Sequence, residues 1–440
     1  MEALPSSPEP IECERCHRTS TLEAAFVRRK RAAGGRSRGV CFECEGKRQV
    51  NSILFLTIFS LVFACFNANL APNSAIGNFY LLLFWGLLAC IPLLVLHELA
   101  HAAAARLLGF RVFAIHLGMG GPLLATRFLG LTWVIHPAPV SAVTVIAGPE
   151  LGYYRLRLFF ITLAGPGLHA LLAAAAWFTY HNFGLPGTWY LVLFWTNVFL
   201  LAVNLFPRKA LVAVGATGTD GLSLLQIPRM GRDELQKRFA GYYLLGTVAE
   251  VERGDHREAI RFAEQGAALY PGEPNILNAL GYARIYTGEY SRSRDYFLQA
   301  LALEEKLTPA MEAIMLNNVA FADLLLDDPA LLPEADAYSD RACQAYFWEP
   351  AVLGTRGGVL IALDQAKEGL DLLRQSLEKG FEKRGKASDA CLIAWGEMKL
   401  GRPAEAEKYL ALARRLDPLC PLLDFANRKM GKVNSKPLEV

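Results

Sequence analysis

Two histidines and a glutamate within five residues are the strongest chemical signal in the sequence. Residues 97–101 read His-Glu-Leu-Ala-His inside a long apolar stretch. On a helix, positions four apart lie on one face, so His97 and His101 can hold one zinc ion together. Glu98 lies one step around the helix, where it can act as a general base on water activated by the metal. The alternative, two packed histidines beside a salt-linked glutamate, is disfavoured because ionisable groups in apolar membrane segments are costly and usually functional.

A catalytic zinc ion needs a third protein ligand and an open fourth position. Acidic candidates are few, because residues 46–219 contain only Glu98 and Glu150, and the next carboxylate is Asp220. Asp220 follows the apolar stretch that ends in Asn204-Leu205-Phe206-Pro207, and we take it as the third ligand. The alternative ligands are Glu150, His116, His136 and His169.

Four of the nine cysteines form two close pairs near the N-terminus. Cys13-x-x-Cys16 and Cys41-x-x-Cys44 have the spacing of a zinc ribbon, in which four thiolates bind a structural zinc ion and leave no position for substrate. Cys16-His17 also completes the C-x-x-C-H string of haem attachment. Haem attachment takes place outside the cytosol, whereas the basic residues described below place this end of the chain inside, so zinc is favoured. Free thiols are the remaining alternative.

The apolar residues are unevenly distributed along the chain. Residues 46–219 contain only two carboxylates, which is not the composition of a soluble domain. Four apolar stretches are each about as long as the roughly 20 helical residues that cross a hydrocarbon core. We therefore expect a lipid bilayer as partner. The net charge of +3 is small and the basic residues do not line one face, so we expect no nucleic acid. The four stretches lie near residues 52–70, 78–105, 157–180 and 187–206.

Lysine and arginine residues beside these stretches predict their orientation. Every basic pair falls on one side of the four predicted spans, whereas the loops 71–77 and 181–186 carry no Lys or Arg. We therefore expect an integral, multi-pass protein of a bacterial cytoplasmic membrane with both termini in the cytosol. The basic pairs are Lys47 and Arg48, Arg106 and Arg111, Arg155 and Arg157, and Arg208 and Lys209.

Residues 110–150, between the second and third stretches, differ from their surroundings. They are apolar, β-branched and rich in Gly and Pro, which predicts short strands and turns. Such backbone is tolerated at membrane depth only where protein covers it or where it lines a wet cavity.

After residue 232 the sequence has the pattern of soluble amphipathic helices. Gly254 recurs 34 residues later as Gly288, and Ala259 aligns with Ser293. The segment 277–300 follows the tetratricopeptide pattern, and the whole region 240–425 resembles a tetratricopeptide solenoid. An unrelated array of helical hairpins is the alternative. Either arrangement gives stacked helix pairs with a concave surface suited to a protein or peptide partner.

The predicted fold is mainly α. A polytopic helical membrane core with a short β-like insert is joined to a cytosolic α-solenoid and a small zinc ribbon. The expected domains are a zinc-ribbon-like module with a basic linker at 1–49, a membrane metalloprotease core at 50–230, a repeat domain at 236–430 and a tail at 431–440.

Residues 78–225 resemble the site-2 protease family of intramembrane zinc metalloproteases. Three features carry the resemblance: HExxH in an apolar helix, the Gly-Pro of Ala164-Gly165-Pro166, and an Asn-x-x-Pro element followed by Asp220-Gly221. The family implies zinc on His97, His101 and Asp220, Glu98 as base, and an extended substrate that joins a strand-forming stretch beside the active site. One departure is that Lys209 to Thr219 separate the last two elements, which are nearly contiguous in the family.

Two further residues are candidates near the active site. His169 and Asn204 are candidates to contact substrate or to stabilise the oxyanion, with polar packing as the alternative for both. We interpret Ala164-Gly165-Pro166-Gly167 as a close helix–helix contact.

These observations predict a zinc metalloendopeptidase that hydrolyses peptide bonds of membrane-protein substrates within or next to the bilayer. A substrate helix must first unwind locally, because its peptide bonds are hydrogen-bonded and shielded. The alternative is a catalytically degenerate membrane scaffold that docks protein partners through its repeats. The complete HExxH favours the protease, and the altered Asn-to-Asp spacing favours the scaffold. A transporter with a metal site is disfavoured by the small number of spans and by Glu98 beside the histidines.

Overall fold

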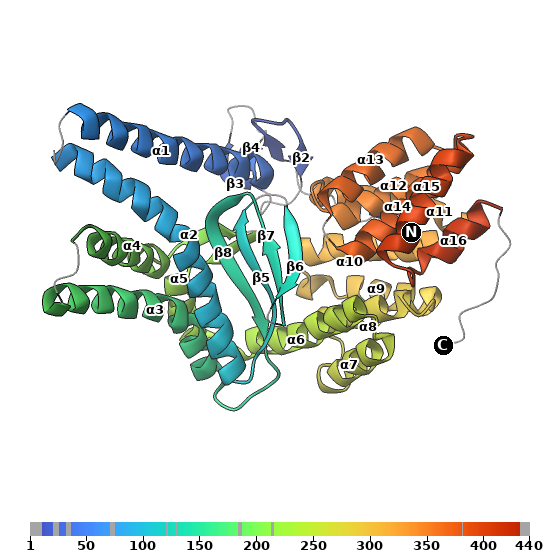
Figure 1. Cartoon of the computed structure of the whole chain (residues 1–440). Coiled ribbons are helices and arrows are strands. Elements are labelled where there is room, and N and C mark those ends of the chain that lie inside the picture. The colour runs from blue at the N-terminus through green and yellow to red at the C-terminus, as the bar shows by residue number, and fades with distance from the viewer. Residues whose placement is uncertain are drawn as a thin grey trace. The chain divides into compact units, whose positions relative to one another are not determined.

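The computed structural model describes residues 11–20, 26–31, 37–70, 75–119, 122–128, 130–183, 187–212, 215–380 and 382–431. They form two compact units (Figure 1). The membrane unit covers residues 41–235, and the repeat unit combines residues 1–40 with residues 236–440. The predicted tail lies outside the described residues except for Gly431.

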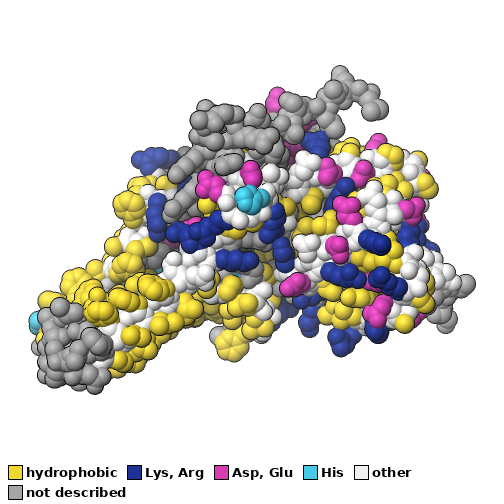
Figure 2. Space-filling model, turned by 90° about the horizontal axis from the view of Figure 1, so that it is seen from above, with side chains coloured by type: hydrophobic (Ala, Val, Ile, Leu, Met, Phe, Trp, Pro, Cys, Tyr) yellow, Lys and Arg dark blue, Asp and Glu magenta, His cyan; other side chains and the backbone are white. Residues whose placement is uncertain are grey.

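Four apolar helices form most of the membrane unit. Large hydrophobic side chains on their surfaces are exposed, among them Phe55 (68%) and Trp195 (60%). Exposed apolar surface of this extent is costly in water, so lipid must cover it. Figure 2 shows hydrophobic side chains gathered over this part of the molecule. The helices are α1 (Phe42–Leu70), α2 (Ala75–Leu107), α3 (Tyr154–Phe183) and α4 (Gly187–Leu205).

By length and apolarity alone, a helix of the repeat unit, α10 (Pro309–Leu326), also meets the requirements of a membrane span, whereas α4 falls just short. Burial separates the two cases. Inside the protein 56% of α10 is buried, against 11%, 6% and 33% for the apolar windows of α1, α2 and α3. The hydrophobic side chains of α10 belong to the core of the repeat unit. Because α4 has 19 residues and a helix rises about 1.5 Å per residue, α4 is about long enough to cross a bilayer.

The segment between α2 and α3 folds as a four-stranded sheet, as its composition predicts. The strand order is β6-β7-β5-β8, with β7 parallel and β8 antiparallel to β5. Ile115 and Trp133 of the sheet pack with Ala102 of α2, so protein covers this face of the strands. The strand β8 lies at an edge of the sheet. The strands are β5 (Arg111–Met119), β6 (Leu124–Phe128), β7 (Leu131–Ile135) and β8 (Ala138–Ala147).

The chain leaves α4 through a hairpin and a short helix. The hairpin strands β9 (Lys209–Val212) and β10 (Gly215–Gly218) pair antiparallel. They are followed by α5 (Asp220–Gln226) and the 3-10 helix η2 (Ile227–Arg229).

A second four-stranded sheet lies near the N-terminus. Its order is β2-β1-β4-β3, and β1 pairs antiparallel with β2 and parallel with β4. The strands are β1 (Ile11–Cys13), β2 (Thr19–Ser20), β3 (Phe26–Arg31) and β4 (Ser37–Cys41).

The repeat unit is built from consecutive antiparallel helix pairs. Gly254 and Gly288 both adopt positive φ at the turn inside a pair, where a residue without Cβ is favoured. Ala259 and Ser293 are both fully buried, so the 34-residue period records equivalent packing positions. The helices are α6 (Arg232–Arg253), α7 (His256–Leu269), α8 (Pro274–Ile285), α9 (Tyr290–Leu301), η3 (Glu304–Lys306), α10 (Pro309–Leu326), η4 (Pro329–Leu331), α11 (Leu332–Ala345), α12 (Pro350–Ala362), α13 (Ala366–Lys379), α14 (Lys383–Lys399), α15 (Pro403–Leu416) and α16 (Leu422–Lys429).

The predicted fold class is confirmed. The chain is mainly α, with four apolar helices, a small β insert, helical repeats and a four-cysteine cluster.

Candidate metal centre

The HELAH residues lie on α2, and all three ionisable side chains are buried. His97, Glu98 and His101 are 3%, 4% and 8% exposed. Buried ionisable groups must be paired or coordinate a metal, because an isolated charge in a medium of low polarity is costly. The environment of this short stretch therefore favours a metal site over solvent-exposed helix surface.

The side chain of Asp220 reaches both histidines from α5. The Nε2 atoms of His97 and His101 lie 3.1 Å apart. Oδ2 of Asp220 is 3.1 Å from His97 Nε2, and Oδ1 is 3.5 Å from His101 Nε2. Two ligand atoms at ~2.0–2.1 Å from zinc are about 3.3 Å apart in a tetrahedron. The three donors therefore have the spacing of one face of a zinc site.

Gly165 of α3 leaves room for an ion between these donors. A Cβ atom at this position would lie 2.5 Å from His101 Nε2 and 2.6 Å from His97 Nε2. Any side chain larger than that of glycine would thus occupy the space toward which both nitrogen atoms point. The close helix–helix contact that the sequence predicts at Gly165 thus also borders the candidate metal centre.

A backbone hydrogen bond orients one of the two imidazoles. Nδ1 of His101 donates to the carbonyl oxygen of Ile161 on α3, at 2.7 Å. In the neutral ring the proton then lies on Nδ1 and the Nε2 lone pair faces the other ligands, as in most metal-bound histidines.

The hairpin explains how Asp220 reaches the histidines despite the inserted residues. The two ends of the hairpin lie side by side, because Thr219 N–H donates to the carbonyl oxygen of Arg208 at 2.9 Å. Thr219 Oγ1 donates to the carbonyl oxygen of Phe206 at 2.8 Å, which also ties the start of α5 to the end of α4. Gly221 permits this contact, since a Cβ there would lie 1.8 Å from the Leu205 oxygen.

Asp220 is ionised at neutral pH in this environment. Burial by itself raises the pKa of a carboxyl group, but the hydrogen bonds to His101 and His97 lower the pKa of Asp220 to about 2. An ionised carboxylate beside two imidazoles is the donor set expected for Zn²⁺.

Thr144 of β8 holds the side chain of Glu98. The hydroxyl group of Thr144 donates to Glu98 Oε2 at 2.6 Å, and it lies 3.2 Å from the Glu98 carbonyl oxygen. No sequence pattern points to Thr144, because it lies 46 residues from Glu98.

His169 of α3 lies beside the site. Its ring stacks on that of His97 with centroids 5.0 Å apart, and the side chain is fully buried. Nδ1 donates to Asn197 Oδ1 at 2.8 Å, and the Asn197 amide donates to the Leu193 carbonyl oxygen at 2.8 Å. These bonds place the proton of a neutral His169 on Nδ1, so Nε2 is an acceptor. Only the imidazolium form could donate to an oxyanion.

The other predicted residues lie elsewhere. The amide of Asn204 donates to the Leu200 carbonyl oxygen at 2.9 Å. Nδ1 of His116 on β5 lies 3.2 Å from Nε2 of His136, which follows β7. Glu150 is exposed. None of the alternative ligands belongs to the His97, His101 and Asp220 cluster found among the described residues.

The four cysteines of the ribbon meet in a second cluster. Their Sγ atoms all lie within 4.8 Å of one another. Cys13 and Cys41 end strands β1 and β4, and both side chains are buried. His17 lies outside this cluster, largely exposed, with its Nδ1 2.9 Å from Glu12 Oε1. Four convergent thiols fit a tetrahedral structural zinc site.

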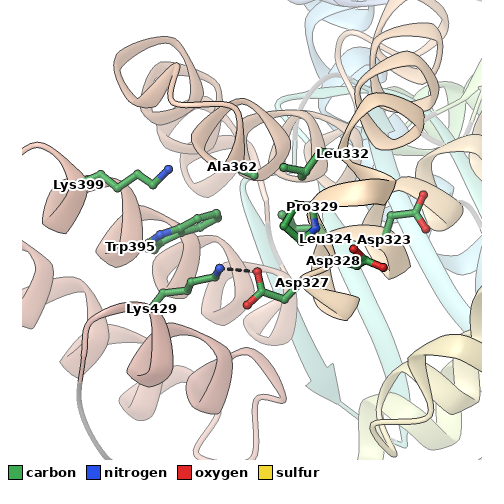
Figure 3. A pocket seen from close by; sticks show the side chains of 10 residues that line it. All are labelled: Asp323, Leu324, Asp327, Asp328, Pro329, Leu332, Ala362, Trp395, Lys399 and Lys429. Carbon is green, nitrogen blue, oxygen red and sulfur yellow. Dashed lines mark hydrogen bonds and ion pairs between the residues drawn. The ribbon is translucent and has the colours of Figure 1, made fainter.

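A cavity of about 380 Å³ lies in the repeat unit (Figure 3). The indole of Trp395 forms one wall, and the ammonium groups of Lys399 and Lys429 each lie 5.3 Å from its ring. Lys429 pairs with Asp327, and Lys399 pairs with Asp364 at 2.7 Å. The lining residues are Asp323, Leu324, Asp327, Asp328, Pro329, Leu332, Ala362, Trp395, Lys399 and Lys429.

Comparison with solved structures concerns the repeats. A tetratricopeptide protein of Thermus thermophilus is 18% identical, with a TM-score of 0.34, and the match covers 44% of this chain and 97% of that one. MamA from Desulfovibrio magneticus RS-1 is 14% identical (TM-score 0.29; 41% and 95% covered). YrrB, a tetratricopeptide protein with an unusual peptide-binding site, is 16% identical (TM-score 0.27; 44% and 95% covered). The repeat assignment rests on the antiparallel helix pairs of this chain and on their 34-residue period.

Sequence comparison concerns the membrane unit. No curated protein matches the chain. The model of peptidase family M50 matches residues 85–186, which include the HELAH residues, the four-stranded sheet and Gly165 of α3. Asp220 lies beyond the matched residues, and the structure brings it to the two histidines. The membrane unit therefore contains a peptidase family M50 domain, and the chain is a zinc metalloprotease of the site-2 protease kind.

Proposed function

We propose that this protein is an intramembrane protease that hydrolyses peptide bonds of membrane-protein substrates within or next to the bilayer. The observation that carries the proposal is the meeting of His97, His101 and Asp220 around the space that Gly165 leaves. Two of these ligands lie on α2, whose outer surface is apolar enough for lipid. A peptide bond must therefore reach the site at or near membrane depth.

The three ligands would hold one zinc ion, which supplies a Lewis acid that activates water and polarises the scissile carbonyl group. Glu98 takes one proton from the attacking water as the new C–O bond forms. The same proton then moves to the amide nitrogen, and the C–N bond breaks to give a carboxylic acid and an amine. The buried position of Glu98 restricts access of other waters to this base.

The edge of the β5–β8 sheet supports recognition of an extended substrate. A strand at a sheet edge offers N–H and C=O groups to another chain. β8 lies at such an edge, and its Thr144 contacts Glu98. An unwound substrate segment that pairs with β8 would thus lie close to the general base.

The test uses the full-length chain in detergent, loaded with zinc and given candidate membrane substrates. Glu98→Gln should keep zinc and stop cleavage, because the amide retains the shape of the side chain and cannot accept the proton. His97→Ala, His101→Ala and Asp220→Asn should lose both zinc and cleavage. Glu150→Gln is the matched control, since this exposed carboxylate should affect neither measurement.

The outcomes separate the protease from the scaffold. If Glu98→Gln cleaves at the wild-type rate, Glu98 is not the base and the proposed mechanism fails. If the zinc-loaded wild-type chain cleaves none of the substrates, the scaffold function is favoured. If Asp220→Asn keeps full zinc and near-normal cleavage, the third ligand is another residue. Loss of a ligand should abolish zinc binding, whereas a change to a residue outside the ligand set lowers metal affinity or activity only about 10–100-fold.

For the repeat unit we propose a peptide partner that places a side chain in the Trp395 cavity. The indole of Trp395 offers an apolar wall, and the two lysines beside it are already paired with Asp327 and Asp364, so the cavity suits an apolar side chain. Peptides selected from a random library on the full-length chain should be enriched in large apolar residues and should lose binding to Trp395→Ala. Selection of the same peptides by wild type and Trp395→Ala would exclude this cavity as the site.

A further inference from the structure

The contact between Thr144 and Glu98 has the geometry of a strong hydrogen bond. The 2.6 Å separation between Thr144 Oγ1 and Glu98 Oε2 lies within the range of roughly 2.5–2.7 Å for a hydroxyl group bonded to a carboxylate. The Glu98 carbonyl oxygen is farther, at 3.2 Å. Since a hydroxyl group has one proton, the nearer carboxylate oxygen is the main acceptor.

This hydrogen bond restricts the orientation of the Glu98 carboxylate. The side chain of glutamate has three rotatable bonds, and its burial alone does not place an oxygen atom beside the attacking water. Threonine is β-branched and adopts few χ1 rotamers, so on a strand it is a rigid donor. With Oε2 engaged by Thr144, Oε1 is the carboxylate oxygen left for the proton of the water.

The position of Thr144 in the sheet connects this base to the substrate. Thr144 of β8 pairs with Ile115 of β5, so pairing with β5 fixes the position of Thr144 along its strand. Its strand is also the edge strand that an extended substrate would join. One strand would therefore set the position of both the peptide bond and the base.

We propose that Thr144 is a positioning residue that orients Glu98 for proton transfer. Its hydrogen bond would hold the Glu98 carboxylate at a fixed position relative to the edge strand β8. The inference rests on the proposed protease function. Thr144 is not one of the metal ligands. In this role its hydroxyl group is required and its methyl group is not.

Two substitutions of Thr144 separate orientation from packing in the full-length, zinc-loaded chain. Thr144→Val keeps the shape and removes the hydroxyl group, whereas Thr144→Ser keeps the hydroxyl group and removes the methyl group. For a positioning residue, Val should lower kcat by about 10–100-fold with KM nearly unchanged, and Ser should restore most of kcat. For a packing residue the order is reversed. Thr132→Val on β7, separated from β8 by β5, is the matched control and should leave kcat and zinc content unchanged.

A binding measurement tests the inference without hydrolysis. A peptidyl hydroxamate binds a metal through two oxygen atoms and gives its proton to the neighbouring base. Thr144→Val should bind this probe about tenfold more weakly or worse at full zinc content, and Thr144→Ser should bind it almost as wild type does. Equal kcat, or equal hydroxamate affinity, in wild type and Thr144→Val would overturn the inference. A wild-type chain that binds zinc and hydroxamate but cleaves no substrate would instead count against the proposed function.

Discussion

Gly165 leaves the space between the candidate metal ligands, although it contributes no ligand itself. The donors come from α2 and α5, and the third wall of the site is the backbone of α3. Close packing of protein interiors leaves little free volume, so space for an ion must be built into the sequence. Here the absence of one Cβ atom provides it.

The substitution Gly165→Ala tests this interpretation directly. Its Cβ would lie 2.5 Å from His101 Nε2, so we expect zinc content to fall at least about tenfold while the helix forms normally. Gly167→Ala is the matched control, because a Cβ at that position meets nothing within 4 Å. The measurement is zinc per chain after dialysis. Equal zinc content in both variants would show that the ion lies elsewhere.

At the residue scale, the sequence indicates which side chains meet better than it indicates which residues support them. His97, Glu98 and His101 follow one another on a single helix, so their geometry can be read from spacing alone. Thr144 lies 46 residues from Glu98, and Ile161 lies 60 residues from His101. Their contacts depend on the register of β8 and on the packing of α3 against α2, and no local pattern in the chain encodes either.

Among the elements, the β9–β10 hairpin shows why spacing in sequence can mislead. The inserted residues seemed to separate Asp220 from the Asn204-x-x-Pro207 element. In the fold they form a closed hairpin whose ends, Arg208 and Thr219, are joined by hydrogen bonds. The strands are four residues each and rich in small residues, which gives no strong strand pattern. The spacing that favoured the scaffold is thus compatible with an intact ligand set.

We predict that the hairpin can be removed without loss of zinc. In this variant Lys209–Gly218 is replaced by Asn-Gly, a pair that favours a tight two-residue turn. Zinc content should stay at the wild-type level, because the Arg208–Thr219 contact and the α5 start remain.

Gly221→Ala is the opposing variant for the same measurement. It keeps the hairpin but places a Cβ 1.8 Å from the Leu205 oxygen, so it should displace Asp220 and lower the zinc content. Loss of zinc on hairpin removal would mean that the strands themselves support the ligand set.

The repeat helices could be predicted well because their pattern is local. Amphipathic helices joined by turns at Gly254 and Gly288 repeat with a fixed period. The helix α10 illustrates the limit of composition, since its apolar sequence suits either a membrane or a protein core. Only its burial against neighbouring repeat helices distinguishes the two.

For the whole molecule, the metal centre and the basic residues give independent evidence on topology. His101 lies near the end of α2, and Asp220 follows α4, yet their side chains meet. Both helices therefore end on the same side of the membrane, as expected if α3 and α4 each cross it. The Lys and Arg residues predict that this side faces the cytosol.

The last prediction is the location of three positions in the membrane topology. Reporters inserted at residues 74 and 184 should be found outside the cytosol, and one at residue 435 inside. Position 435 is decisive, because it lies beyond α10. If α10 crossed the membrane, as its length and apolarity allow, residue 435 would be outside together with residue 74. If instead residue 184 were inside, α3 would not cross, and the meeting of Asp220 with His97 and His101 would need a different fold of the membrane unit. A phosphatase reporter that is active only outside, paired with a fluorescent reporter that matures only inside, gives a positive signal for either answer.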